Sequence, residues 1–319
     1  MKNGGQSSTR KKKRARLSTV IVILLAIAGI CVMLYPTASD MVFRWQASRE
    51  IAQYNAVSEG SDVDYSEMWA AAEEYNRQLA ENGTFSASVS ADEADYISQL
   101  LNPLGTGMMG YIDIPAINVH IPIYQGTDEA ALQAGAGFWL GTSLPTGGAG
   151  THCVLTAHNG LTKAKMFTDI DQLEIGDTFT ITVLDRTLTY EVDQILVVEP
   201  DDFSAMTIIE GEDHVTLYTC TPYGVNTHRL LVRGTRVEST TDTTSGADVI
   251  TVISEIVTDT DIRDVILVVL VLLLVILIAL LISVLMPPKK KRRRRAKNRK
   301  IKESPEEKEG SIDEEKDDS

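Results

Sequence analysis

The chain has 319 residues, of which 44% are hydrophobic and 6% aromatic, and its formal net charge is −14. Most of the basic residues lie at the two ends, so residues 17–288 carry 35 acidic side chains against 10 basic ones. A central region this acidic repels nucleic-acid phosphates, which argues against DNA or RNA as a partner.

Two apolar runs are long enough to cross a bilayer, which needs about 20 helical residues for a hydrocarbon core of about 30 Å. The first covers residues 17–35 and follows a basic segment, and the second covers 265–286 and precedes another basic segment. Because positive charge marks the cytoplasmic side, both termini are expected in the cytoplasm and the region between them outside the cell.

Each apolar run has an alternative interpretation. A small-residue site, Thr37-Ala38-Ser39, follows the first run, which could therefore be a cleaved signal peptide. The first run is longer than the usual apolar core of a signal peptide, which favours an uncleaved anchor. The second run lacks the polar stripe that a buried core helix in a soluble domain normally shows, so we expect a transmembrane helix there.

The chain is expected to contain seven segments in order. They are a basic cytoplasmic N-terminus 1–16, a transmembrane helix 17–35, a helical arm 36–106, a β-rich domain 107–238, a linker 239–264, a transmembrane helix 265–286 and a basic then acidic cytoplasmic tail 287–319. Helical spacing of apolar residues predicts helices over Met41–Asn55 and Tyr65–Glu81 of the arm.

From Gly110 onwards the sequence consists of short runs rich in β-branched residues, separated by Gly, Pro, Asp and Asn. This pattern predicts a β-barrel or a β-sandwich. The candidate strands are Met109–Ile112, Val119–Tyr124, His152–Thr156, Thr178–Leu184, Leu188–Val198, His214–Thr219 and Arg229–Val237. A short helix is predicted over Thr127–Gln133 with Thr127 as its N-cap, and a helical turn within Ala164–Leu173.

Three polar residues at predicted strand ends suggest nucleophilic chemistry. Cys220 ends one strand, His158 follows another, and Arg229 begins the strand after Cys220, where a hairpin would return it to the cysteine. A thiol needs access and a thiolate fraction to react. A buried, inert Cys220 and a structural Cys153–Cys220 disulfide remain open, because disulfides form outside the cell.

The other potential ligands do not suggest a metal site. Cys31 lies in the first apolar run, where a thiol is simply a small apolar group. The remaining histidines rank below His158, and none has clear metal-ligand spacing. They are His120, His152, His214 and His228. We therefore expect neither a metal nor another cofactor.

The segment Thr216-Leu217-Tyr218-Thr219-Cys220 matches the sortase signature T-L-x-T-C, and its continuation to Gly234 resembles class C sortases, which assemble pili. The similarity extends over about residues 65–237. It includes the segments Met109–Pro115, Gly141–Pro145, Thr156–Gly160 and Val197–Asp202. Two membrane spans, one at each end, also occur in that branch.

The resemblance implies an eight-stranded sortase β-barrel with an N-terminal helical arm, working at the surface of a Gram-positive cell. It further implies that Cys220 attacks a secreted protein at an LPxTG-like sorting signal and forms a thioester, which a pilin lysine or another amine resolves. His158 would transfer protons and Arg229 would stabilise the oxyanion. The alternatives are a sortase that anchors proteins to cell-wall peptide, and a non-catalytic, membrane-tethered binding module with the Cys153–Cys220 disulfide.

The sequence departs from the class C pattern in three places. The lid stretch, roughly Gly83–Asp95, lacks the usual Asp-Pro-aromatic triplet, with Phe85 and Tyr96 as possible substitutes. Cys153 stands where relatives commonly carry a small residue. Asn159 stands where Arg is frequent after the histidine.

Overall fold

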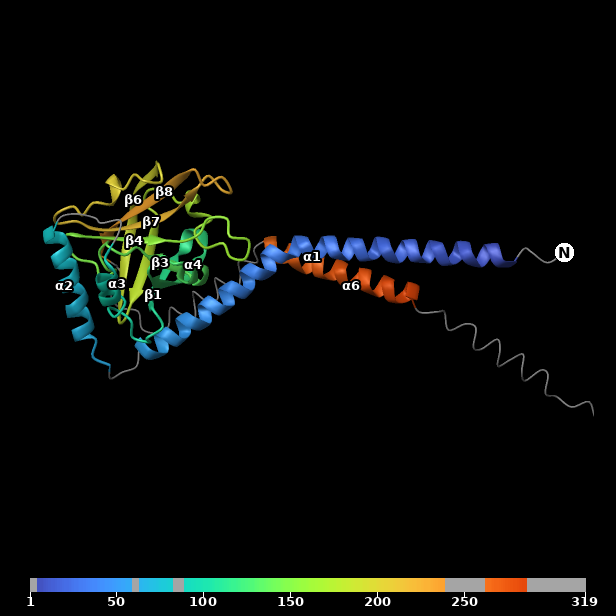
Figure 1. Cartoon of the computed structure of the whole chain (residues 1–319), viewed down its shortest axis with the longest axis horizontal. Coiled ribbons are helices and arrows are strands. Elements are labelled where there is room, and N and C mark those ends of the chain that lie inside the picture. Colours follow the sequence, from blue (N-terminus) through green and yellow to red (C-terminus); the bar gives the residue numbers. More distant parts are fainter. Residues whose placement is uncertain (1–4, 59–62, 83–88, 239–261, 286–319) are drawn as a thin grey trace, which may run out of the picture. The chain divides into compact units, whose positions relative to one another are not determined.

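The computed structural model describes residues 5–58, 63–82, 89–238 and 262–285. The chain divides into two compact units, one formed by Met1–Val32 with Asp261–Ser319 and the other by Met33–Thr260. The second unit holds every described strand (Figure 1).

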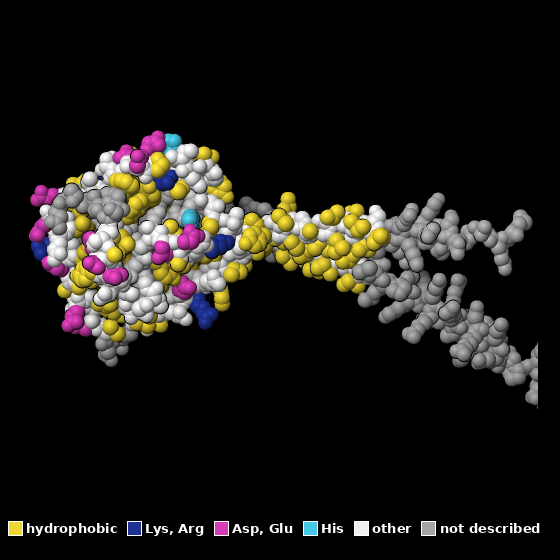
Figure 2. Space-filling model, viewed as in Figure 1, with side chains coloured by type: hydrophobic (Ala, Val, Ile, Leu, Met, Phe, Trp, Pro, Cys, Tyr) yellow, Lys and Arg dark blue, Asp and Glu magenta, His cyan; other side chains and the backbone are white. Residues whose placement is uncertain are grey.

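The first unit contains the beginning of helix α1 (Gly5–Ser58) and helix α6 (Ile262–Leu285). Apolar side chains of α1 such as Leu25 and Val32 are exposed, and Figure 2 shows hydrophobic side chains covering the helical segment. Among the described residues α1 alone is long and apolar enough to cross a membrane, since the apolar stretch described in α6, Val269–Ile282, is shorter. The first predicted span is therefore confirmed as an apolar helix, and the second stays a prediction.

Helix α1 does not end with the apolar run, as the sequence suggested, but continues to Ser58. Pro36 lies inside it, and its carbonyl oxygen accepts a hydrogen bond of 3.0 Å from the Ser39 hydroxyl. The arm helix predicted over Met41–Asn55 is thus the second half of one 54-residue helix.

The second unit is built on a closed barrel of eight strands in the order β1-β2-β3-β4-β7-β8-β6-β5. The strands are β1 Met108–Ile114, β2 Val119–Gln125, β3 Ala136–Phe138, β4 Thr151–Thr156, β5 Thr178–Val183, β6 Arg186–Val198, β7 Asp213–Thr221 and β8 His228–Val237. Two pairs, β2 with β3 and β4 with β7, are parallel, and the others are antiparallel. This confirms the predicted eight-stranded barrel.

The strands alternate between core and surface, as a two-residue repeat requires. In β5, for example, Phe179, Ile181 and Val183 are fully buried, and in β7 Val215 and Leu217 belong to the same main core. Strand β3 escaped the sequence analysis because its three residues, Ala-Gly-Phe, contain no β-branched side chain.

Short helices surround the barrel. They are α2 Ser66–Asn82, α3 Ala91–Ile97, α4 Glu129–Ala134 and the 3-10 turns η1 Pro115–Ile117, η2 Ile170–Gln172 and η3 Ser204–Met206. Helix α2 confirms the second arm helix, and η2 confirms the turn predicted within Ala164–Leu173. The predicted cap Thr127 is wrong by one residue, because the Asp128 carboxylate accepts the Ala131 N–H at 2.9 Å.

The predicted lid stretch is only partly described. Residues 83–88, which include Phe85, lie outside the described residues. Ser90 caps α3 by accepting a hydrogen bond from the Glu93 N–H, and Tyr96 of α3 is exposed.

Tyr54 ties α1 to the barrel. Its fully buried hydroxyl donates to the Met109 carbonyl oxygen at 2.6 Å and accepts from the Leu184 N–H at 2.7 Å. One side chain therefore satisfies two backbone groups, one in β1 and one in the turn after β5.

We predict that Tyr54→Phe lowers the free energy of unfolding by about 1–3 kcal/mol, because both buried backbone groups lose their partner. Tyr75→Phe is the matched control, since its buried hydroxyl has no hydrogen-bond partner among the described residues, and its removal should not lower stability. Urea unfolding of the detergent-solubilised chain measures both. Equal effects of the two substitutions would contradict the role given to Tyr54.

Candidate active site

Cys220 and Arg229 lie directly opposite each other on β7 and β8. Opposed residues of an antiparallel pair have Cα atoms about 4.5–5.5 Å apart, so the hairpin brings the two predicted residues together. Cys220 is a free, half-buried thiol near the end of β7. A hairpin therefore accounts for the nine-residue spacing between Cys220 and Arg229, as the sequence predicted.

His158 follows β4, which runs parallel to β7 with Thr156 opposite Tyr218. Three hydrogen bonds continue this pairing beyond the strand. The Ala157 N–H donates to the Tyr218 carbonyl oxygen at 3.3 Å, and the Ala157 carbonyl oxygen accepts from the Thr219 hydroxyl at 2.7 Å. The Asn159 side-chain amide donates to the Cys220 carbonyl oxygen at 2.7 Å. His158 is therefore held beside the end of β7 that carries Cys220.

The Arg229 guanidinium is oriented by the hairpin turn. Its Nη1 donates to the carbonyl oxygens of Asn226 at 3.1 Å and His228 at 3.0 Å. Burial raises the pKa of the Tyr218 hydroxyl above its ordinary value, while the charge of Arg229 and a hydrogen bond with it oppose that rise. Arg229 therefore sits between the turn and Tyr218, with donors fixed in place.

Tyr218 is a site residue that the sequence analysis missed. It lies two residues before Cys220, so alternation puts both side chains on one face of β7. Tyr218 is 6% exposed and makes an edge contact with Trp139 at 5.0 Å between ring centroids, and Trp139 also contacts Phe203 at 5.8 Å. Tyr218 occupies the variable position x of T-L-x-T-C, so the signature did not single it out. The two-residue repeat of a strand could have shown that it shares a face with Cys220.

The His158 ring has an unused nitrogen. Its Nε2 atom is buried and has no hydrogen-bond partner among the described residues. Buried polar atoms without partners are uncommon in folded proteins, and they often occur where chemistry takes place. No described residue therefore occupies this nitrogen, although the atom itself is buried.

Cys153 cannot form the disulfide with Cys220. The register places Cys153 opposite Val215, five residues along β7 from Cys220, and Cys153 belongs to the barrel core, whereas Cys220 shares the other face with Tyr218. Both thiols are free. Burial raises the pKa of Cys153 well above its ordinary value, which keeps it protonated. The disulfide alternative is therefore wrong, because the pleat directs the two sulfurs to opposite faces.

The other histidines make structural contacts. His120 pairs with Asp113, and His228 Nε2 lies 3.4 Å from a Glu199 carboxylate oxygen. His152 and His214 are buried with ring centroids 5.5 Å apart. Among the described residues no three His, Cys, Asp or Glu side chains are grouped as a metal site would require.

A sequence profile of the sortase domain family matches residues 112–237. Sortase C1 from Streptococcus agalactiae is 45% identical, with 60% of this chain and 98% of that chain covered and a TM-score of 0.58. The chain belongs to the sortase family. Class C sortases are among its similar structures, and the sortase relatives indicate a cysteine transpeptidase.

Two further sortase C structures are similar. The enzyme of Streptococcus pneumoniae, described as informing catalysis and pilin substrate specificity, is 42% identical, with 60% and 97% of the two chains covered and a TM-score of 0.53. That of Clostridium perfringens, solved with the C-terminal cell wall sorting motif, is 41% identical, with 60% and 100% covered and a TM-score of 0.52. The chain spans about three fifths of the length of the curated sortases it matches, from Bacillus and Streptococcus.

Because His152 is buried, we expect the free energy of unfolding to decrease in acid. Burial lowers its pKa from 6.5 to about 4, with a smaller repulsion from His214 and Arg233, while a hydrogen bond with Thr207 opposes the shift. The unfolded chain binds a proton as the pH falls through about 6.5, but folded His152 does so only near 4. Stability should therefore fall between these values by about 3 kcal/mol and level off below them.

We expect His152→Gln to flatten this part of the pH dependence of the unfolding free energy, measured by urea denaturation between pH 7 and 4. His120→Gln is the control, because His120 is an exposed residue paired with Asp113. If His152→Gln and the wild type lose stability in parallel as the pH falls, His152 does not cause the acid sensitivity.

Proposed function

We propose that this chain is a membrane-anchored cysteine transpeptidase that uses Cys220, His158 and Arg229 to transfer a sorting-signal acyl group to an amine. The observation that carries the proposal is the pairing of β7 on both sides. Arg229 lies opposite Cys220 on one side, and the His158 segment is hydrogen-bonded to residues 218–220 on the other. Family membership supports the reaction class.

Acylation begins when the Cys220 sulfur attacks the threonine carbonyl carbon of an LPxTG-like signal and its proton passes to the His158 ring. The carbonyl oxygen becomes an oxyanion, which the oriented guanidinium of Arg229 stabilises. Losing one such donor typically lowers the rate about 10²- to 10³-fold. The unpartnered Nε2 of His158 supports its part as the proton acceptor.

Collapse of the tetrahedral intermediate breaks the amide C–N bond, and the His158 imidazolium protonates the departing amine. The product is a thioester between Cys220 and the threonine acyl group. An incoming amine then gives its proton to His158 and attacks the thioester, which forms a new amide and returns the thiol. The thioester conserves the acyl group's reactivity, so neither a nucleotide nor a metal enters these steps.

The solved relatives support the substrate class. The Clostridium perfringens structure contains a cell wall sorting motif, and the Streptococcus pneumoniae structure is described as informing pilin substrate specificity. We therefore propose a secreted protein with an LPxTG-like signal as the donor and a pilin lysine as the acceptor. Acidic side chains over the visible face of the barrel unit favour a lysine-bearing acceptor through long-range attraction (Figure 2).

We further propose that residues 17–35 and 265–286 both span the membrane, with the β-rich domain 107–238 outside the cell. The uninterrupted helix through the small-residue site Thr37-Ala38-Ser39 supports an uncleaved first anchor. Basic residues on the outer flank of each run support cytoplasmic ends 1–16 and 287–319, with the acidic part of the tail beyond them.

The topology predicts that a fluorescent protein fused after Ser319 is fluorescent inside the cell, whereas an export-dependent phosphatase fused at the same position stays inactive. The same phosphatase inserted after Glu238 serves as the external control. Activity of the Ser319 phosphatase fusion outside the cell would contradict two spans.

Cys220→Ala should abolish the covalent adduct with an LPxTG-type peptide, because it removes the attacking sulfur. Arg229→Ala should slow adduct formation about 10²- to 10³-fold, and His158→Ala should also reduce it severely. Mass spectrometry of the acid-quenched chain detects the adduct. Cys153→Ala is the control and should keep the adduct. Near-normal acyl transfer by Cys220→Ala would end the proposal.

The pilin assignment has its own test. Purified full-length chain incubated with pilin subunits alone should give a covalent ladder on denaturing gels, which a lysine-to-arginine pilin removes. Transfer to a cell-wall peptide amine without any ladder would favour the wall-anchoring alternative over the pilin assignment. That result would leave the transpeptidase chemistry intact.

A further inference from the structure

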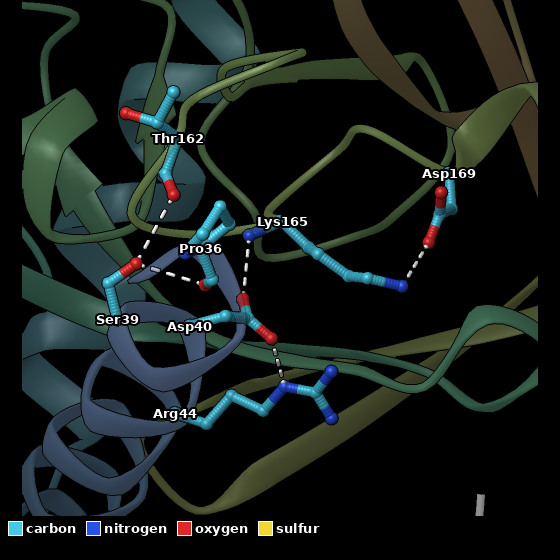
Figure 3. A network of polar contacts seen from close by, with 7 residues as sticks. All are labelled: Pro36, Ser39, Asp40, Arg44, Thr162, Lys165 and Asp169. Carbon is cyan, nitrogen blue, oxygen red and sulfur yellow. Dashed lines mark hydrogen bonds and ion pairs between the residues drawn. The ribbon is translucent and has the colours of Figure 1, made fainter. Parts of the chain in front are cut away.

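The second half of α1 contacts the loop that follows His158, residues 159–169. The Lys165 backbone N–H donates to Asp40 Oδ1 at 2.8 Å, and the Ser39 hydroxyl donates to the Thr162 carbonyl oxygen at 3.2 Å (Figure 3). Both contacts join residues more than 120 positions apart. Residues 33–58 of α1 belong to the same compact unit as the barrel, so this is a contact within one body.

The Asp40 carboxylate is itself held in place. Its second oxygen accepts a hydrogen bond of 2.9 Å from Arg44 Nε, and its side chain is only 15% exposed. Figure 3 shows Asp40 between Arg44 and the Lys165 backbone. One turn of helix thus presents an oriented acceptor to a loop, while Phe43 on the same helix joins the core cluster that contains Phe167 of the loop.

The same loop holds the His158 backbone. The Phe167 N–H donates to the His158 carbonyl oxygen at 3.2 Å, and the Gly160 N–H donates to the Thr168 hydroxyl at 3.1 Å. These bonds lie two or three residues from the Lys165 contact with Asp40. His158 Nε2 has no hydrogen-bond partner among the described residues, so no bond at that atom fixes the ring, whereas the His158 backbone is fixed by the loop.

We propose that Asp40 is a positioning residue for His158, acting through the loop 159–169. This proposal rests on the proposed function, in which His158 transfers protons. Asp40 fixes Lys165, the loop fixes the His158 carbonyl, and the imidazole is thereby held beside Cys220. Misplacing a catalytic group by about 1 Å can cost about 10²-fold in rate, so a contact this close to the histidine can control turnover without touching substrate.

Four variants of the full-length chain in detergent micelles separate positioning from simple stability. Asp40→Ala removes both acceptors, and Asp40→Asn keeps an amide oxygen for the Lys165 N–H. Arg44→Ala removes the ion pair but leaves the acceptor of Lys165. Glu74→Ala is the surface control, because it breaks an exposed helical ion pair with Arg77 on α2.

Two measurements are made on each variant. The first is kcat and KM for acylation by an LPxTG-type peptide. The second follows the titration of the His158 imidazole by NMR with 13C-labelled histidine, assigned with His158→Gln, and requires no activity. We expect Asp40→Ala to lower kcat about 10- to 100-fold with little change in KM and to alter the His158 titration curve. Asp40→Asn and Arg44→Ala should lie nearer the wild type than Asp40→Ala does, and Glu74→Ala should match the wild type.

Unchanged kcat and an unchanged His158 titration in a folded Asp40→Ala chain would overturn the proposal. If Asp40→Ala does not fold, Asp40→Leu decides by the same two readouts, because it keeps the branched side-chain shape but offers no acceptor to the Lys165 N–H. Wild-type kcat and an unchanged His158 titration in that variant would contradict positioning. An inactive wild type would refute the proposed function. The NMR titration of His158 requires no activity, so it would still test whether Asp40 positions the His158 ring.

Discussion

The pairing of β7 with two neighbours of opposite direction is the constraint on which the site depends. Its parallel pairing with β4 and its antiparallel pairing with β8 bring three chain segments to the same end of the barrel. Cys220, His158 and Arg229 are separated by up to 71 positions in sequence. A shift of one residue in either register would send the cysteine or the arginine to the wrong face, since side chains alternate along a strand.

The order of residues along β7 also explains why the two cysteines of the barrel unit differ in burial. Leu217 and Thr219 face inward and help to close the core, whereas Tyr218 and Cys220 face the aromatic side with Trp139. Cys153 belongs to the inward set, where burial suppresses ionisation. The alternation of side chains therefore places the Cys153 thiol in the packed core and leaves the Cys220 thiol half-buried on the opposite face.

Much of this could be predicted from local patterns. Seven of the strands carry β-branched residues between turn formers, and the T-L-x-T-C segment correctly placed Cys220 near the end of a strand, β7. The three-residue β3 and the cap at Asp128 escaped because neither has a distinctive composition. The Asp40 contact with Lys165 escaped for a different reason, because the two residues lie 125 positions apart and no local pattern encodes such a contact. The two-residue repeat could have placed Tyr218 on the face of Cys220, but not its contact with Trp139.

If Cys220 is the nucleophile, as proposed, its location on the outward face of the barrel wall has a consequence for the size of substrate that the enzyme could accept. A nucleophile inside a barrel would admit only what fits through its mouth. A nucleophile on the outside wall needs only a short extended tail laid along the strands, with the bulk of the cargo remaining in solvent. Under the proposed function, the fold would set no upper limit on the mass of the protein being joined, and folded cargo would not need to be unfolded.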